Sequence, residues 1–140
     1  MAKFTFTTLI EGYENKNLTC VTALVSILFE EDDCHVVVPS QFNNLPVTHV
    51  CFTQGYEPAH EHWHDWHHPT AYGSEWVDGK YSAVSAKTIE IPCHVQTLTL
   101  PSTTSHVGNF AFSYSKKTTV LLPDENPHKK SLAPYLKSCK

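Results

Sequence analysis

The sequence lacks most of the short motifs that assign a chemical activity. It has only five glycines, and none of them forms the GxGxxG or P-loop patterns that hold phosphates. It has no HExxH motif and no CxxC pair, so neither a zinc protease nor a paired-cysteine zinc site is indicated. The cysteines are odd in number and widely spaced, which is typical of reduced, mostly buried thiols.

Charge and long apolar runs are equally sparse. The formal net charge is −4 with neutral histidines, so the sequence gives no basic footprint for nucleic acid. No segment reaches the roughly 18 consecutive apolar residues that a membrane span needs. The first residues alternate Phe and Thr instead of forming the apolar run of an export signal. We therefore expect no nucleic-acid or membrane partner, and a cytoplasmic location by default.

What the sequence does contain is a globular, β-rich pattern. At 140 residues, with 41% hydrophobic and 17% charged residues, the chain has the size and composition of a single domain. FTFTTLI, near the start, alternates apolar residues with Thr, as a half-buried strand does. The run LTCVTALVSILF is rich in β-branched residues and favours strand, although TALVSILF is short enough to form a helix instead.

Short apolar runs that end in proline recur along the chain. They are VVVP at Pro39, IEIP at Pro92, LTLP at Pro101 and VLLP at Pro123. Proline removes a ladder donor and turns the chain out of a sheet. The 22 residues from Pro101 to Pro123 fall within the period of leucine-rich repeats. The pattern predicts stacked coils that each contribute one parallel strand.

The segment LTLPSTTSHVGNFAFSYSKKTTVLLP closely resembles the BspA-like (Treponema-type) leucine-rich repeat. The positions that match are Leu98, Leu100 and Pro101 at the strand, then Val107, Gly108, Ala111 and Phe112. VVVPSQFNNLPVTHV resembles a longer first repeat, and IEIPCHVQTL resembles half of one. The resemblance implies a β-rich, leucine-rich-repeat-like solenoid with few coils and short helical turns, working as a non-catalytic protein-binding module. Family members are often surface-associated, which makes the cell surface the alternative location.

On this interpretation the chain divides into a strand cap at 1–35, coils at 36–123 with an insertion at 52–86, and a cap at 124–140. In the second cap, Asn126 and Pro127 are typical of a helix start, and Pro134 limits that helix. Coils with an exposed strand edge at either end would allow a homodimer.

The insertion holds AHEHWHDWHHP, with five of the ten histidines. In a helix or in an extended segment, several of these imidazoles share one face. Two or three neutral imidazoles and a carboxylate suit Zn²⁺, Ni²⁺ or Cu²⁺. The candidate metal ligands are His60, His62, His64, His67 and His68. The spacing matches no closed zinc site, so we expect an exposed loop and no cofactor. Zinc or nickel binding is the alternative. A third interpretation is that the loop responds to pH near 6.

The same insertion is dense in the aromatic residue types that dominate interface hot spots. The candidate binding residues are Tyr56, Trp63, Trp66, Tyr72 and Trp76. The alternative is that these rings cover the side of the coil as part of its core. A catalytic pair of Cys51 with His49 or His35 can be imagined, but no motif surrounds either cysteine. The sequence therefore predicts no enzyme and an unknown protein partner.

Overall fold

We describe the protein from a computed structural model that places residues 1–13, 16–57 and 80–140. This part of the chain is mostly β-structure, in curled sheets that mix parallel and antiparallel strand pairs. The one α-helix within it is short, α2 (Lys129–Leu132), and a 3-10 turn follows directly, η2 (Ala133–Leu136).

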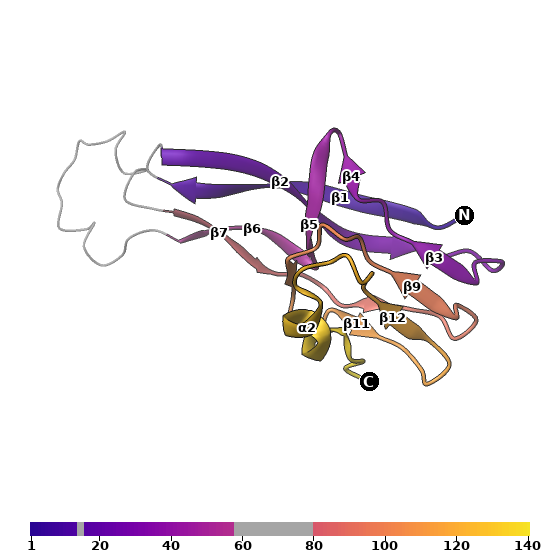
Figure 1. The fold of residues 1–140 in the computed structure, drawn as a ribbon. Coiled ribbons are helices and arrows are strands. Elements are labelled where there is room, and N and C mark those ends of the chain that lie inside the picture. Colours follow the sequence, from indigo (N-terminus) through magenta and orange to yellow (C-terminus); the bar gives the residue numbers. More distant parts are fainter. Residues whose placement is uncertain (14–15, 58–79) are drawn as a thin grey trace.

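Two antiparallel hairpins form the elongated side of the molecule. β1 (Lys3–Tyr13) pairs with β2 (Lys16–Leu28), and β6 (Phe52–Glu57) pairs with β7 (Lys80–Ser85). The hairpins contact each other and extend together, away from the part of the molecule that holds both termini (Figure 1). The strand prediction for TALVSILF is confirmed, because β2 continues through Leu28.

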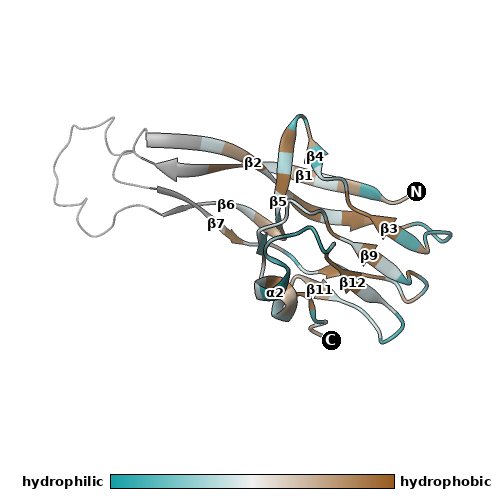
Figure 2. Cartoon of the chain, in the orientation of Figure 1, coloured by the Kyte–Doolittle hydropathy of each residue, from teal (hydrophilic) through white to brown (hydrophobic). Residues whose placement is uncertain are grey.

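Short parallel strands form the opposite side. β3 (His35–Val37), β9 (Thr97–Thr99) and β12 (Thr119–Leu121) make one three-stranded parallel sheet, in the order β12-β9-β3. Each of these strands ends two residues before a proline, namely Pro39, Pro101 or Pro123. The apolar-proline runs predicted strand ends at these places. The apolar residues gather in these strands, while the turns that join them are hydrophilic (Figure 2).

Two further sets of strands close the body. β8 (Ile89–Glu90) pairs in parallel with β11 (Phe112–Ser113) in a separate two-stranded sheet. β5 (Leu45–Val50) pairs in parallel with β10 (His106–Val107) and with β2. It also makes a tight antiparallel hairpin with β4 (Gln41–Phe42).

The predicted leucine-rich-repeat-like solenoid is wrong as the fold of this chain. The run ending at Pro92 lies in the two-stranded sheet with β11, apart from the sheet that holds the runs ending at Pro101 and Pro123. Two long antiparallel hairpins, which a stack of one-strand coils does not contain, make up the other side. The physical reason is that a proline dictates where a strand stops, whereas the partner of a two- or three-residue strand depends on how distant apolar faces close around the core.

That core lies among the short strands. Val36, Leu98 and Val120 occupy one register position across β3, β9 and β12, and all three side chains are buried. Phe112 is fully buried, whereas Phe110, which has a positive φ of 58°, is 72% exposed. The two side chains differ in burial because Phe110 lies in a turn, whereas Phe112 begins β11.

A buried amide, that of Asn126, helps to attach the C-terminal segment. Asn126 is 3% exposed, and its Nδ2 donates to the backbone oxygens of Pro101 at 3.2 Å and Thr104 at 2.9 Å. Its Oδ1 accepts from the His128 backbone N–H at 2.7 Å, which resembles the predicted cap, although α2 begins only at Lys129. The α-helix ends before Pro134, and the chain continues as η2.

Replacing Asn126 with Ala should lower the free energy of unfolding by about 2 kcal/mol, because it leaves buried carbonyl groups without their donor. Urea denaturation measures the change. The neighbouring Glu125→Ala variant is the matched control, since Glu125 is exposed and should alter stability by less than about 0.5 kcal/mol. Equal stability of the two variants would contradict this role of Asn126.

Candidate functional site

The outer edge of β12 is open. In the ladder between β9 and β12, the Thr119 N–H donates to Gln96 O and the Leu100 N–H donates to Leu121 O, both at 2.9 Å. Backbone hydrogen bonding alternates along a strand, so the N–H and C=O of Val120 point away from β9. Within the described part of the chain, no strand pairs with β12 on that side.

Two other strand edges are covered by contacts within the protein, at β1 and at β11. At the edge of β1, the Gln54 side chain accepts from the Ile10 N–H at 2.6 Å and donates to the Ile10 oxygen at 3.3 Å. At β11, the Cys139 N–H donates to Phe112 O at 3.0 Å, and Ser138 binds both backbone groups of Tyr114 at 2.9 Å. Unpaired strand edges promote association, and proteins usually block them in such ways. Among the residues that the structure describes, no comparable contact protects the outer edge of β12.

A groove of about 330 Å³ runs beside the open edge. One wall is β12 with its flanking residues, and the other is the C-terminal segment, with Ala133 and Leu136. Lys129 and Lys137 also line it, and Leu121 presents an apolar side chain that is 41% exposed. The groove therefore combines backbone hydrogen-bonding groups, apolar walls and positive charge.

Positive charge is concentrated in this region. Residues 116–140 contain six of the ten lysines and only two of the fourteen carboxylates. Lys116 and Lys117 form the exposed turn before β12, and Asp124 and Glu125 form the exposed turn after it. The hydrogen bond from Lys129, at 2.5 Å, lowers the pKa of the Asp124 carboxyl. The rest of the sequence contains four lysines and twelve of the fourteen carboxylates.

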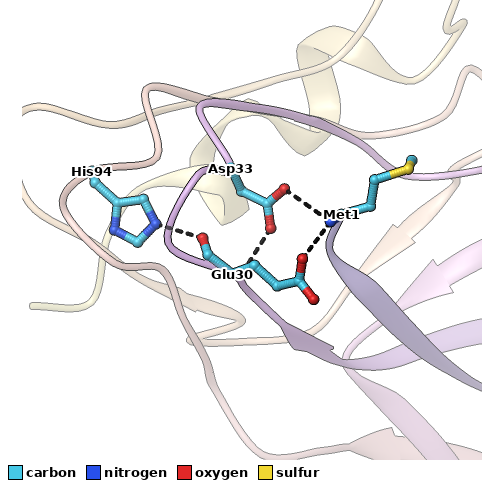
Figure 3. A network of polar contacts seen from close by, with 4 residues as sticks. All are labelled: Met1, Glu30, Asp33 and His94. Carbon is cyan, nitrogen blue, oxygen red and sulfur yellow. Dashed lines mark hydrogen bonds and ion pairs between the residues drawn. The ribbon is translucent and has the colours of Figure 1, made fainter.

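The turn before β3, the other outer strand of this sheet, is acidic, and polar contacts hold it in place (Figure 3). The turn before β3 has Glu30, whose carboxylate accepts from the Met1 amino group, with Asp33 also within 4.0 Å of that nitrogen. The Asp33 carboxylate accepts from the Glu30 N–H at 2.7 Å, and His94 Nε2 contacts Glu30 O at 2.8 Å. The two outer strands of one sheet are thus preceded by turns of opposite charge.

A second concave site lies between β10 and the C-terminal segment. Its volume is about 410 Å³, and its lining includes Phe52, His106, Leu132 and Tyr135 with the hydroxyls of three serines. Among the described residues, no Lys, Asp or Glu lines it. This pocket adjoins the core, and nothing about its lining selects one class of ligand.

Beside that pocket, two histidines stack across the β5–β10 ladder. His49 and His106 are register partners. Their ring centroids are 4.2 Å apart, and the angle between the ring planes is 5°. The Nδ1 of each ring contacts the hydroxyl of the preceding residue at 2.8 Å, Thr48 for one and Ser105 for the other. His49 is 2% exposed, and burial, with a smaller effect of His106, lowers its pKa to about 4. The His49 ring is therefore neutral at physiological pH.

The imagined nucleophile, Cys51, lies in the core of the protein. Cys51 is fully buried, and its Sγ contacts the Ala111 oxygen at 3.4 Å. Burial raises the pKa of its thiol to about 12, so the nucleophilic thiolate is scarce at neutral pH. His35 is exposed at the start of β3 and contacts Thr97.

Most residues singled out from the sequence fall outside the described part of the chain. This applies to the candidate binding residues Trp63, Trp66, Tyr72 and Trp76, and to the candidate metal ligands His60, His62, His64, His67 and His68. The backbone of Tyr56 lies on β6 opposite Tyr81 of β7. Among the described residues, no group of three or more His, Cys, Asp or Glu is placed to hold a metal ion.

Sequence reasoning missed the β12 edge as a site, although two signals were present. VLLP is the last of the apolar-proline runs in the sequence, so it lies at one end of their order. It also lies between a basic and an acidic dipeptide, Lys116–Lys117 and Asp124–Glu125. The stacked histidines likewise have a signal, because His49 and His106 each follow a hydroxyl residue and precede a valine.

Comparison with models of known families, with curated proteins and with solved structures found no match to this chain. Within residues 1–13, 16–57 and 80–140, no helix has the length and apolar character needed to cross a membrane.

Proposed function

We propose that this protein is a non-catalytic interaction module that binds an extended segment of a polypeptide by strand addition to β12. The observation that carries the proposal is the unprotected edge of β12 beside an apolar, lysine-lined groove. Main-chain hydrogen bonds to Val120 would supply affinity, and the groove walls would select side chains. The lysines around the groove favour a segment that carries Asp or Glu.

The backbone arrangement sets the pattern of the bound segment. An added strand alternates its side chains, so every second residue would face the surface that presents Leu121 and Thr119. β-Branched or aromatic residues suit these positions, because they pack well on a pleated surface. Carboxylates at the ends of the segment would lie near Lys129 and Lys137 or near the turn at Lys116.

A library of displayed, random linear peptides of about ten residues tests this proposal without knowledge of the natural partner. We expect enriched peptides to alternate β-branched with polar residues and to contain Asp or Glu. Leu121→Asp removes an apolar wall and repels acidic peptides, so it should weaken their binding at least about 10-fold.

The matched control is Val37→Asp. Val37 is the corresponding exposed residue on the outer strand β3 of the same sheet, at 66% exposure. It should leave peptide affinity unchanged. Peptides that bind the Leu121 and Val37 variants equally well, or a failure to enrich any peptide on the native protein, would refute strand addition at β12.

A further inference from the structure

We propose that the segment which occupies the β12 edge is β12 of a second copy of this chain, paired antiparallel about a twofold axis at Val120. This inference rests on the proposed strand addition and names its partner. A single open edge then satisfies both copies, and no second unprotected strand is required. Twofold dimers with self-complementary surfaces are the commonest closed assemblies.

The backbone groups fit this register. The N–H and C=O of Val120 both point outward, so two Val120 residues can exchange their hydrogen bonds as a directly opposed antiparallel pair. By the same alternation, the Leu122 N–H points outward and would donate to the Thr118 oxygen of the second copy. Val120 and Leu122 keep their side chains in the core of their own copy, where they are buried.

The charges decide between the two directions of pairing. The turn before β12 is basic, with Lys116 and Lys117, and the turn after it is acidic, with Asp124 and Glu125. All four side chains belong to exposed residues. Antiparallel pairing brings the basic turn of each copy beside the acidic turn of the other. Parallel pairing would bring like charges together, which disfavours it.

The outer face of β12 adds an apolar contact. With Val120 opposite Val120, Thr119 of one copy lies opposite Leu121 of the other in a non-hydrogen-bonded pair, where side chains approach most closely. Leu121 is 41% exposed in the single chain, so pairing would remove apolar surface from water. The groove wall formed by Ala133 and Leu136 continues this apolar surface.

A charge-swap experiment tests the pairing by sedimentation velocity. The native chain should show a reversible monomer–dimer equilibrium that weakens as salt screens the charged turns. The variant K116E/K117E and the variant D124K/E125K should each dimerise at least about 10-fold more weakly, because like charges then face each other. An equimolar mixture of the two should recover the native affinity as a heterodimer, in which every turn again meets its opposite.

Cross-linking tests the register independently. In a background with the exposed Cys20, Cys93 and Cys139 replaced by Ser, a mixture of Thr119→Cys and Leu121→Cys chains should form a disulfide-linked dimer under mild oxidation. Val37→Cys on the other outer strand is the matched control and should remain monomeric.

The outcomes separate this inference from the proposal on which it rests. A native chain that stays monomeric to about 1 mM, a mixture that fails to recover dimerisation, or equal cross-linking through Val37 would overturn the homodimer. If displayed peptides still bind in a Leu121-dependent manner, strand addition stands with a different partner. If neither dimer nor peptide binds, both fail.

Discussion

Replacing Gly108 with Ala should destabilise the protein by about 3 kcal/mol, with a melting temperature lower by about 10 °C. An added Cβ would lie 2.6 Å from the backbone oxygen of Cys51 and 3.4 Å from its Cβ. That backbone cannot easily move. The Cys51 oxygen accepts from the Ala86 N–H at 2.8 Å, and its N–H donates to Leu24 O at 2.7 Å. The close approach of two backbones, and not a left-handed conformation, therefore requires glycine at this position.

Differential scanning calorimetry measures the loss, with Asn109→Ala as the neighbouring control. Asn109 is exposed, so its replacement should change stability by less than about 0.5 kcal/mol. A Gly108→Ala variant as stable as the native protein would show that β5 and β10 do not approach each other as described. Because Gly108 follows the strand that bears His106, the same result would also remove the basis for the stacked histidines.

The second large effect is on the pH dependence of folding. Burial lowers the pKa of His49 from an ordinary value of 6.5 to about 4, so the native state favours the neutral ring. A group with a lowered native pKa contributes its full stability above pH 6.5. As the pH falls from 6.5 toward 4, the unfolded chain gains a proton that the native chain does not. Stability should therefore decrease by about 3 kcal/mol across that range from this residue alone.

Urea denaturation at a series of pH values between 4 and 7 tests this prediction. His49→Phe retains a stacked ring without a titrating group. Its loss of stability between pH 6.5 and 4 should therefore be about 3 kcal/mol smaller than that of the native protein. His35→Gln, on an exposed strand end, is the control and should follow the native profile. Parallel profiles for the native protein and the His49 variant would mean that His49 is not held neutral.

Local features of the fold were predictable from the sequence. Alternation and β-branched residues identified the long strands, and β2 runs through Leu28 as expected. The prolines at 39, 101 and 123 correctly indicated strand ends. These features depend on a few neighbouring residues, which is why the sequence carries them.

The pairing of strands was not predictable in the same way. IEIP and LTLP have nearly the same pattern, yet β8 joins β11 and β9 joins β3 and β12. A strand of two or three residues offers few side chains to specify its partner, so pairing depends on the closure of the whole core. The resemblance to a repeat family relied on local pattern alone, and the solenoid it implied was wrong for that reason.

The candidate site illustrates the same limit. The sequence predicted binding residues between Tyr56 and Trp76, because histidine and tryptophan are unusually dense there. An open strand edge is visible only after the partners of every strand are known. The lysines and carboxylates that flank β12 indicate a binding site only once the backbone N–H and C=O of Val120 are known to point away from β9.

The most direct test of the account is the exchange rate of individual backbone amides, measured by NMR. In dilute protein, the amides of Val120 and Leu122 should exchange quickly with solvent, because both point to the open edge. When the edge is saturated, either with a selected peptide or by self-association, the exchange of both amides should slow at least about 10-fold. The exchange of the Leu121 amide, which is already paired with β9, should stay unchanged. Binding that leaves Val120 and Leu122 as exchangeable as before would contradict strand addition at β12.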